Sequence, residues 1–217
     1  MPVDPNSSAR TRQRGTTLVE LSITILILSI VMAIAFMLLT TTNRSLGEAD
    51  TTSRSTDQAR LAIQQMDRQI RSGNVLNDPS KEGLMPDGSI DSDAQAAFIK
   101  PGMAFRVYTQ ANGSQRCVQW RVNTANKTLE TRSWSENFAV DGDVSPWRIV
   151  AENIENTVGT ATQAFSRGNY GDRLIEIRII TNVNAKLRKN ITLESSVTGR
   201  NTEFGYSVGT CLTTPPY

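Results

Sequence analysis

The sequence predicts an α+β fold in which one long N-terminal helix packs on an antiparallel β-sheet domain. Two observations indicate this: an apolar run over residues 18–39, and a change after residue 73 to short strands separated by turns. Within the run the only charged side chain is Glu20. Because a helix of about 20 apolar residues crosses a ~30 Å hydrocarbon core, we expect a transmembrane segment over residues 17–39.

The helix is expected to continue past the membrane, so that it covers residues 16–72. No proline interrupts residues 40–72, whereas Gly47 and its Thr- and Ser-rich surroundings favour a looser helix at that point. Gly73-Asn74 is a plausible C-terminal stop. Apolar or small residues recur at steps of four, three and four, which marks one face for a domain core: Ala59, Ile63, Met66 and Ile70.

Residues 73–217 are expected to form one β-rich domain. Asn112-Gly113 predicts a hairpin turn, because both residues accept positive φ angles. The most apolar candidate strand, residues 173–182, is expected to be central in the sheet. The candidate strands, all bounded by turn residues, cover residues 104–110, 115–123, 128–134, 147–151, 173–182 and 190–198.

Two ordinary kinds of N-terminal segment fit the apolar run incompletely. A cleaved secretory signal has an apolar region of about 7–15 residues followed by a small-residue cleavage site, and neither feature matches. An uncleaved signal anchor needs only length and flanking charge. A passive anchor does not require Glu20. A carboxylate at mid-membrane costs on the order of 2.5–3.5 kcal/mol, so a charged residue within an apolar span indicates a function. Basic residues before the run, Arg10, Arg12 and Arg14, predict a cytoplasmic N-terminus.

Residues 15–21, GTTLVEL, resemble the G-F-T-L-x-E-L signature of type IV prepilins and type II secretion pseudopilins. The resemblance implies that a prepilin peptidase cuts after Gly15, which makes residues 1–15 a leader peptide. It also implies N-methylation of the new N-terminus at Thr16, and an assembly role for Glu20. Thr16 stands where the family usually has Phe or Met, while cleavage depends mainly on the glycine.

The proposed pairing of Thr16 and Glu20 has a physical basis. Cleavage would free an α-amino group with a reference pKa of about 7.7–8.0. In a stack of subunits this cation and the Glu20 carboxylate of a neighbour can neutralise each other, although each charge alone is costly in a low dielectric. Such a pair would fix the register of one subunit against the next.

The expected layout also resembles the pilin fold and, more narrowly, the J-type minor pseudopilins and W-type minor pilins. Retention of Glu20 distinguishes the chain from K-type tip pseudopilins. The segments that carry the narrower resemblance are residues 59–71 (ARLAIQQMDRQIR), 149–154, 174–180 and 197–201 (VTGRN).

The resemblance implies a structural subunit, a minor pilin or pseudopilin that enters or primes a type IV pilus-like filament. The processes in which such a subunit takes part are pilus assembly, adhesion or motility, DNA uptake, or type II secretion. Implied partners are other pilin-like subunits through residues 16–39, the prepilin peptidase and an inner-membrane assembly platform. The implied location is the cytoplasmic membrane before assembly and an extracytoplasmic filament afterwards. The alternative is a surface adhesin or receptor anchored by an uncleaved helix, which would need neither Gly15 nor Glu20.

Composition argues against catalysis and against general binding of nucleic acid. The chain has no histidine and two cysteines, so common zinc ligand sets and histidine-dependent nucleophiles are unavailable, and we expect neither an enzyme nor a cofactor. Of 23 basic and 21 acidic residues, three arginines and one aspartate lie in the leader, which leaves 20 of each. Lys186, Arg188 and Lys189 could contact DNA phosphates, but a solvated hairpin turn is favoured over DNA binding.

Two further patterns each have a structural and a functional interpretation. Asp87, Asp91 and Asp93 could offer oxygen ligands to calcium, but their spacing is not that of an EF-hand, so no metal is expected. The tryptophans at 120, 134 and 147 could form an adhesive patch, although burial in the sheet is favoured.

Cys117 and Cys211 are expected to pair, since both follow the span on its outward side, where disulfides persist. The alternative is two unrelated buried thiols. The bridge would close a loop of about 95 residues and contribute at most about 4–5 kcal/mol. It would hold a Thr- and Pro-rich C-terminal segment that has little else to fix it.

Overall fold

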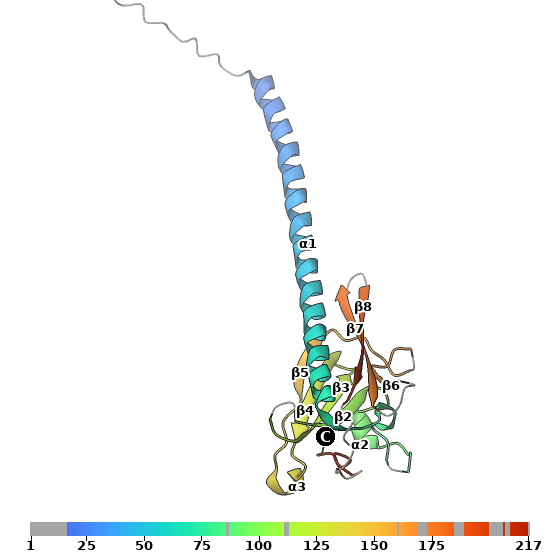
Figure 1. The fold of residues 1–217 in the computed structure, drawn as a ribbon. Coiled ribbons are helices and arrows are strands. Elements are labelled where there is room, and N and C mark those ends of the chain that lie inside the picture. The colour runs from blue at the N-terminus through green and yellow to red at the C-terminus, as the bar shows by residue number, and fades with distance from the viewer. Residues whose placement is uncertain are drawn as a thin grey trace, which may run out of the picture. The chain divides into compact units, whose positions relative to one another are not determined.

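The chain combines one long helix with two antiparallel sheets (Figure 1). It divides into two compact units, Met1–Gly47 and Glu48–Tyr217. Helix α1 (Leu18–Arg71) is 54 residues long and runs unbroken through Gly47, where the sequence favoured a looser helix. The computed structural model describes residues 17–85, 87–110, 113–159, 161–168, 173–184, 189–199, 206 and 209–216.

The eight strands found in the described residues form two antiparallel sheets, which confirms the predicted α+β fold with an antiparallel β domain; the division into two sheets was not predicted. All pairs are antiparallel, and β7 is the central strand of the smaller sheet, as predicted. The first sheet has the order β1-β2-β3-β4-β5, with β1 at Gly73–Leu76, β2 at Ala104–Thr109, β3 at Arg116–Asn123, β4 at Thr128–Trp134 and β5 at Arg148–Glu152. The second has the order β6-β7-β8, with β6 at Phe165–Arg167, β7 at Leu174–Asn184 and β8 at Lys189–Thr198.

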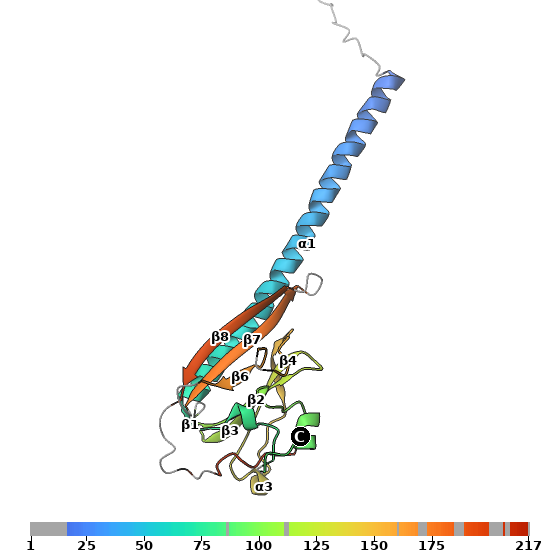
Figure 2. The same ribbon diagram turned by 90° about the vertical axis from the view of Figure 1, so that its right-hand side faces the viewer.

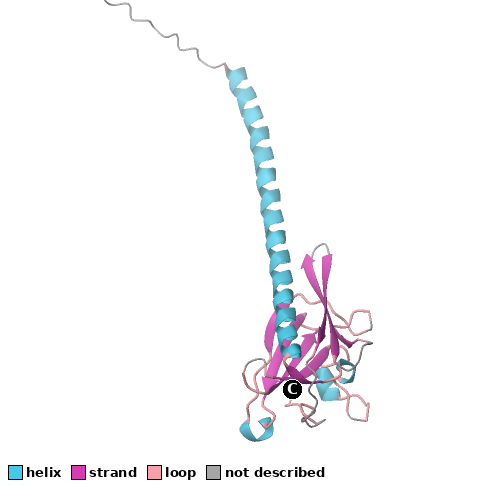
Figure 3. Ribbon diagram, in the orientation of Figure 1, coloured by secondary structure: helices cyan, strands magenta, loops and turns pink. Residues whose placement is uncertain are grey.

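Short helical turns lie between the strands (Figure 3). The six strands expected from the sequence are all present, and each observed bound lies within two residues of the expected one. The short strands β1 and β6 were not expected. The additional helical turns are η1 (Pro79–Lys81), α2 (Ser92–Ala96) and α3 (Phe138–Asp141).

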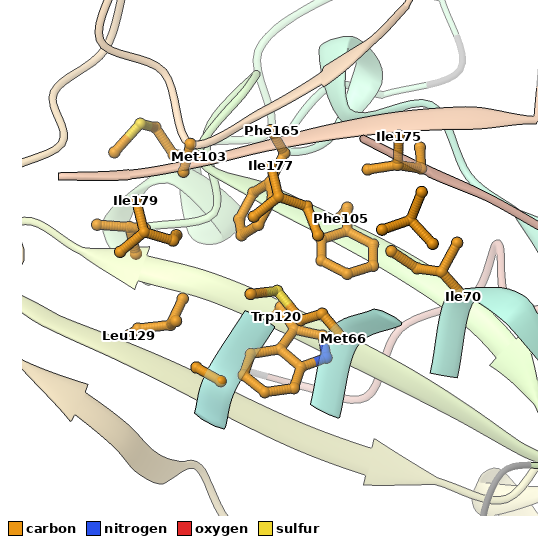
Figure 4. Close-up of a cluster of buried hydrophobic side chains, with 14 of the residues drawn as sticks. Met66, Ile70, Met103, Phe105, Trp120, Leu129, Phe165, Ile175, Ile177 and Ile179 are labelled. Carbon is orange, nitrogen blue, oxygen red and sulfur yellow. The ribbon is translucent and has the colours of Figure 1, made fainter. Parts of the chain in front are cut away.

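The core of the β domain lies between the second half of α1 and both sheets (Figure 4). The predicted face of α1 is buried at Ala59, Met66 and Ile70, and Ile63 is partly buried. Ala62 also belongs to this face. From the sheets come large side chains with 0–1% exposure, namely Phe105, Trp120, Leu129, Phe165, Ile175, Ile177 and Ile179.

Two specific contacts position the helix and the sheets. The rings of Phe105 on β2 and Phe165 on β6 meet edge to face, with centroids 4.7 Å apart, and so join the two sheets. The buried Trp120 indole N–H donates to Gln69 Oε1 of α1 at 2.7 Å. This hydrogen bond satisfies the one polar atom of a side chain that is otherwise apolar.

Gly73 explains why a strand follows the helix without a loop. It pairs with Thr109 of β2, and a Cβ atom at this position would lie 2.5 Å from Val107 Cγ2. A larger residue would therefore push β1 away from β2. The sequence correctly placed the end of the helix here, while the strand depends on a contact made far along the chain.

Candidate functional site: the apolar helix and the disulfide-linked C-terminal segment

The start of α1 is capped by a threonine beside the candidate assembly glutamate. Thr17 Oγ1 accepts a hydrogen bond from the Glu20 backbone N–H at 3.3 Å, and the Thr17 carbonyl accepts from Leu21 N–H at 3.1 Å. Glu20 lies in the first turn, where a carboxylate interacts favourably with the helix dipole. Thr17 and Glu20 thus occupy the positions of a capping box.

The apolar segment over residues 18–39 presents its side chains outward on every side. Its large hydrophobic residues are exposed by 52% at Ile30 to 83% at Leu18. Among the described residues, α1 is the one helix with the length and composition to span a membrane. A helix that is apolar all round needs lipid or other apolar chains around it.

Hydroxyl groups inside the apolar segment are compatible with lipid because the helix satisfies them itself. Ser22 Oγ donates to the Leu18 carbonyl at 2.9 Å, and Ser29 Oγ donates to the Leu26 carbonyl at 2.8 Å. Thr24 makes the same kind of bond. The carboxylate of Glu20 is therefore the one ionisable group that this segment would have to bring into an apolar environment.

Gly15 and Thr16, where cleavage and methylation are expected, lie outside the described residues. So does the proposed leader, residues 1–15. The structure therefore places Glu20 relative to the start of the helix, and the pairing of Glu20 with the Thr16 amine stays a prediction about the assembled state.

Cys117 and Cys211 form a disulfide, with their Cα atoms 5.7 Å apart and 94 residues between them in sequence. This is the pairing that the sequence predicts. Both residues are buried, and they pack with Tyr108 and Trp134 in a small cluster on the outer side of the first sheet. The bridge links β3 to the C-terminal segment, which we define as residues 209–216.

Arginines of the first sheet also hold the C-terminal segment, which corrects the expectation that it has little besides the disulfide to fix it. Arg106 Nη1 donates to the carbonyls of Cys211 at 2.8 Å and Leu212 at 2.9 Å. Arg132 Nη1 donates to the Pro216 carbonyl at 3.2 Å. The C-terminal segment is thus held through its backbone carbonyls, which its Thr- and Pro-rich side-chain composition did not indicate.

A buried polar row positions these two arginines. Strand register places Arg106, Gln119 and Arg132 opposite one another on β2, β3 and β4. Gln119 Oε1 accepts from Arg132 Nη2 at 2.9 Å, while Glu82, with 1% of its side chain exposed, lies 2.7 Å from Arg106. Buried ion pairs of this kind fix a geometry more than they add net stability.

Tyr108 borders the disulfide and has an altered acidity. Its hydroxyl donates to Gln115 Oε1 at 3.0 Å and lies 3.2 Å from Glu136 Oε2. Burial, with a smaller contribution from the Glu136 carboxylate, raises the pKa of Tyr108 to about 12. The phenol therefore stays neutral and keeps donating across the physiological pH range.

Trp120 and Trp134 are fully buried, as predicted for sheet tryptophans. Trp147 is only partly buried and lies beside two arginines, with its ring centre 3.8 Å from Arg121 Cζ and 4.6 Å from Arg132 Cζ. Its indole nitrogen is buried without a partner in the described part of the chain. These cation–π contacts cover the polar row rather than forming an exposed aromatic patch.

The acidic loop residues have local structural roles. Asp87 Oδ1 accepts from the Ser89 hydroxyl at 2.6 Å and from the Ser89 N–H at 2.9 Å, and these two hydrogen bonds lower the pKa of Asp87. Asp91 caps α2 by accepting from the N–H groups of Asp93 and Ala94. No group of three or more His, Cys, Asp or Glu residues that could hold a metal occurs among the described residues.

Of the basic cluster, Lys189 is the first residue of β8, while Lys186 and Arg188 lie outside the described residues. Asn112 of the expected hairpin turn also lies outside them, and its neighbour Gly113 has a φ of +87° between the paired strands β2 and β3.

Sequence reasoning missed the cap at Thr17 and the contacts of Arg106 and Arg132. A Thr-x-x-Glu pattern directly before an apolar run is a sequence signal for the first of these. The arginines gave no such signal, because each contacts carbonyl groups more than 80 residues away in the chain.

Comparison with known families supports the N-terminal resemblance. Residues 10–36 match the family model described as the prokaryotic N-terminal methylation motif. No curated protein and no solved structure matches the chain. The matched residues include Gly15, Thr16 and Glu20, and they support a prepilin-type N-terminus. The α+β architecture is consistent with the pilin fold.

Proposed function

We propose that the chain is a minor pilin or pseudopilin, a structural subunit cut after Gly15 and built into, or priming, a type IV pilus-like filament. The observation that carries the proposal is the methylation-motif match over residues 10–36, which overlaps the exposed apolar segment, residues 18–39, with its single carboxylate. The disulfide-bonded β domain is consistent with export to an oxidising compartment.

The proposed mechanism assigns separate tasks to the parts of the chain. The apolar segment anchors the subunit in the cytoplasmic membrane and then packs against the same segment of neighbouring subunits. Glu20 pairs with the Thr16 amine of a neighbour and so sets the docking register. The β domain, outside the membrane, presents the surface of the filament. No catalytic step is assigned to any residue.

The experiment that tests the proposal measures processing. Co-expression with a prepilin peptidase is expected to remove the first 15 residues, so that intact-mass measurement finds Thr16 at the N-terminus, with or without one added methyl group. Gly15→Asp should block the cut, whereas Arg12→Lys, which keeps the leader charge, should leave the cut unchanged. Full-length chain in purified filaments would overturn the proposal.

A surface adhesin or receptor with an uncleaved anchor is the second candidate. The exposed apolar segment by itself fits this function equally well. The two candidates differ in the processing experiment, because an uncleaved anchor keeps its full mass whether residue 15 is Gly or Asp. Only the filament subunit also depends on Glu20.

A further inference from the structure

Strand β8 lies at one end of the three-stranded sheet and pairs only with β7 within the described residues (Figure 2). β8 is ten residues long, so it has a long row of backbone groups on the side that does not pair with β7. We call the side that faces away from β7 the β8 edge. A strand at a sheet end presents unpaired N–H and C=O groups to any chain that can align with them.

Hydrogen bonds across the sheet show which residues form the β8 edge. In an antiparallel sheet, both backbone groups of a residue point to the same neighbouring strand, and successive residues alternate. Arg178 N–H of β7 donates to the Ala164 carbonyl at 2.8 Å, so even-numbered residues of β7 face the β6 side. Odd-numbered residues of β7 therefore face β8, in agreement with the 3.0 Å bond from Gly199 N–H to the Arg173 carbonyl.

The register carries this alternation onto β8. Ile175 pairs with Val197 and Ile179 with Leu193, so the odd-numbered residues of β8 bond to β7. The backbone groups of the even-numbered residues point outward and have no hydrogen-bond partner in the part of the chain that the structure describes. These outward residues are Asn190, Thr192, Glu194, Ser196 and Thr198.

The β8 edge lacks the features that usually prevent strand pairing. β8 contains no proline, glycine or arginine, and its one lysine, Lys189, is its first residue. After Lys189 the one charged side chain of β8 is Glu194, which is paired at 2.7 Å with Arg178 of the neighbouring strand while 61% of it is exposed. Within the described residues, the β8 edge therefore has no pairing strand.

The side chains on β8 define the chemistry of an added strand. Ile191 and Leu193 are only half-covered on the core side, where Leu193 packs against the domain core. Glu194 and its even-numbered neighbours lie on the opposite, exposed face. Cross-strand neighbours contact each other on the same face of a sheet. A partner therefore needs apolar residues beside Ile191 and Leu193, hydroxyl residues beside the exposed Thr192 and Ser196, and a basic residue beside the exposed part of the Glu194 carboxylate.

We propose that the β8 edge binds an extended segment of another protein by strand addition, and that this segment alternates apolar residues with hydroxyl residues and one basic residue. Backbone hydrogen bonds to the even-numbered residues would supply affinity, and the pairing with Glu194 would supply selectivity. This interaction goes beyond the filament role and does not depend on it, since it involves neither Gly15 nor Glu20.

The test uses the full-length chain in detergent micelles and a labelled, end-capped peptide of sequence Thr-Val-Lys-Val-Thr-Val. Fluorescence anisotropy should show saturable binding. Thr192→Pro removes one outward N–H without breaking the bonds to β7, and it is expected to weaken binding at least tenfold. Thr192→Val keeps the N–H and should bind as the unchanged chain does. Equal binding by Thr192→Pro, or no binding up to about 1 mM peptide, would overturn the proposal.

Two further measurements use the unchanged chain, so that they do not depend on how a variant folds. A peptide N-methylated at every amide cannot pair and should not bind, and a peptide with Glu in place of Lys should bind several-fold more weakly. Equal binding of either peptide would contradict the proposed contacts. Concentration-dependent dimers that Thr192→Pro makes monomeric would assign the edge to a second copy and overturn the assignment to another protein.

Discussion

The two halves of α1 share one continuous backbone but distribute apolar side chains in opposite ways. Over residues 18–39 apolar side chains surround the helix and are all exposed. Over residues 55–70 all of the apolar side chains except the exposed Leu61 form one face, with Ala59, Met66 and Ile70 fully buried against the sheets. The apolar side chains of the first half therefore need lipid or other apolar chains to cover them, while those of the second half are covered by the β domain of the same chain.

This difference separates assembly from stability within a single helix. Changes in the first half should act on membrane insertion or on packing between subunits, and they should leave the unfolding of the β domain unchanged. Changes in the second half should act on unfolding.

The largest expected effect is the loss of assembly at Glu20. Glu20→Ala and Glu20→Gln should both insert into the membrane, since each removes a charge from an apolar segment. Neither should enter filaments, because the Thr16 amine of the neighbouring subunit loses its counter-charge. The amount of the chain in sheared filaments, relative to the amount in membranes, measures the effect. Leu21→Ala is the control that should assemble. Normal incorporation of Glu20→Gln would remove the support for charge pairing.

The next largest effect is expected at the disulfide. Replacing both Cys117 and Cys211 by Ser should lower the free energy of unfolding of the β domain by about 4 kcal/mol, because the bridge closes a long loop. The hydrogen bonds from Arg106 should retain part of the C-terminal segment. Denaturant unfolding of the full-length chain in detergent measures the loss, and membrane extraction should not change. Two free thiols in the denatured, unreduced chain would contradict the bridge.

Two methionines on α1 provide a matched pair. Met66 is fully buried and Met32 is 59% exposed. Met66→Ala should lower the free energy of unfolding of the domain by about 3 kcal/mol, through lost burial and the cavity left behind. Met32→Ala, the same chemical change in the first half, should leave it unchanged within error. Similar losses from both variants would show that the two halves of the helix unfold together.

Local periodicity explains which parts of the fold were predictable. The stripe of Ala59, Met66 and Ile70 and the alternation along β7 are both readable within a dozen residues, and both were confirmed. Strands β1 and β6 have four and three residues and exist through pairing partners elsewhere. No short window of sequence contains that information.

The candidate site shows the same limit. The motif around Glu20 and the pair of cysteines were identifiable because each depends on residue type and order. The hydrogen bonds that fix the C-terminal segment were not identifiable from the sequence, because Arg106 donates to carbonyls 105 and 106 residues later in the chain. Such contacts are fixed only when the register of β2, β3 and β4 is known.

The smallest expected effect is an alkaline titration confined to the β domain. Tyr108 has a pKa of about 12, raised first by burial and then by Glu136, against about 10 in an unfolded chain. A raised pKa means that folding favours the neutral phenol. Its contribution to stability is therefore complete below pH 10 and is lost as pH rises through about 12.

Phenolate absorbance should show one late-titrating tyrosine that Tyr108→Phe removes. The same variant should reduce the fall in stability of the β domain between pH 10 and pH 12. Membrane anchoring by the first half of α1 should not respond, because residues 18–39 contain no tyrosine. If Tyr108 titrates near pH 10, its hydroxyl is solvated, and the cluster around the disulfide is more open than its burial indicates.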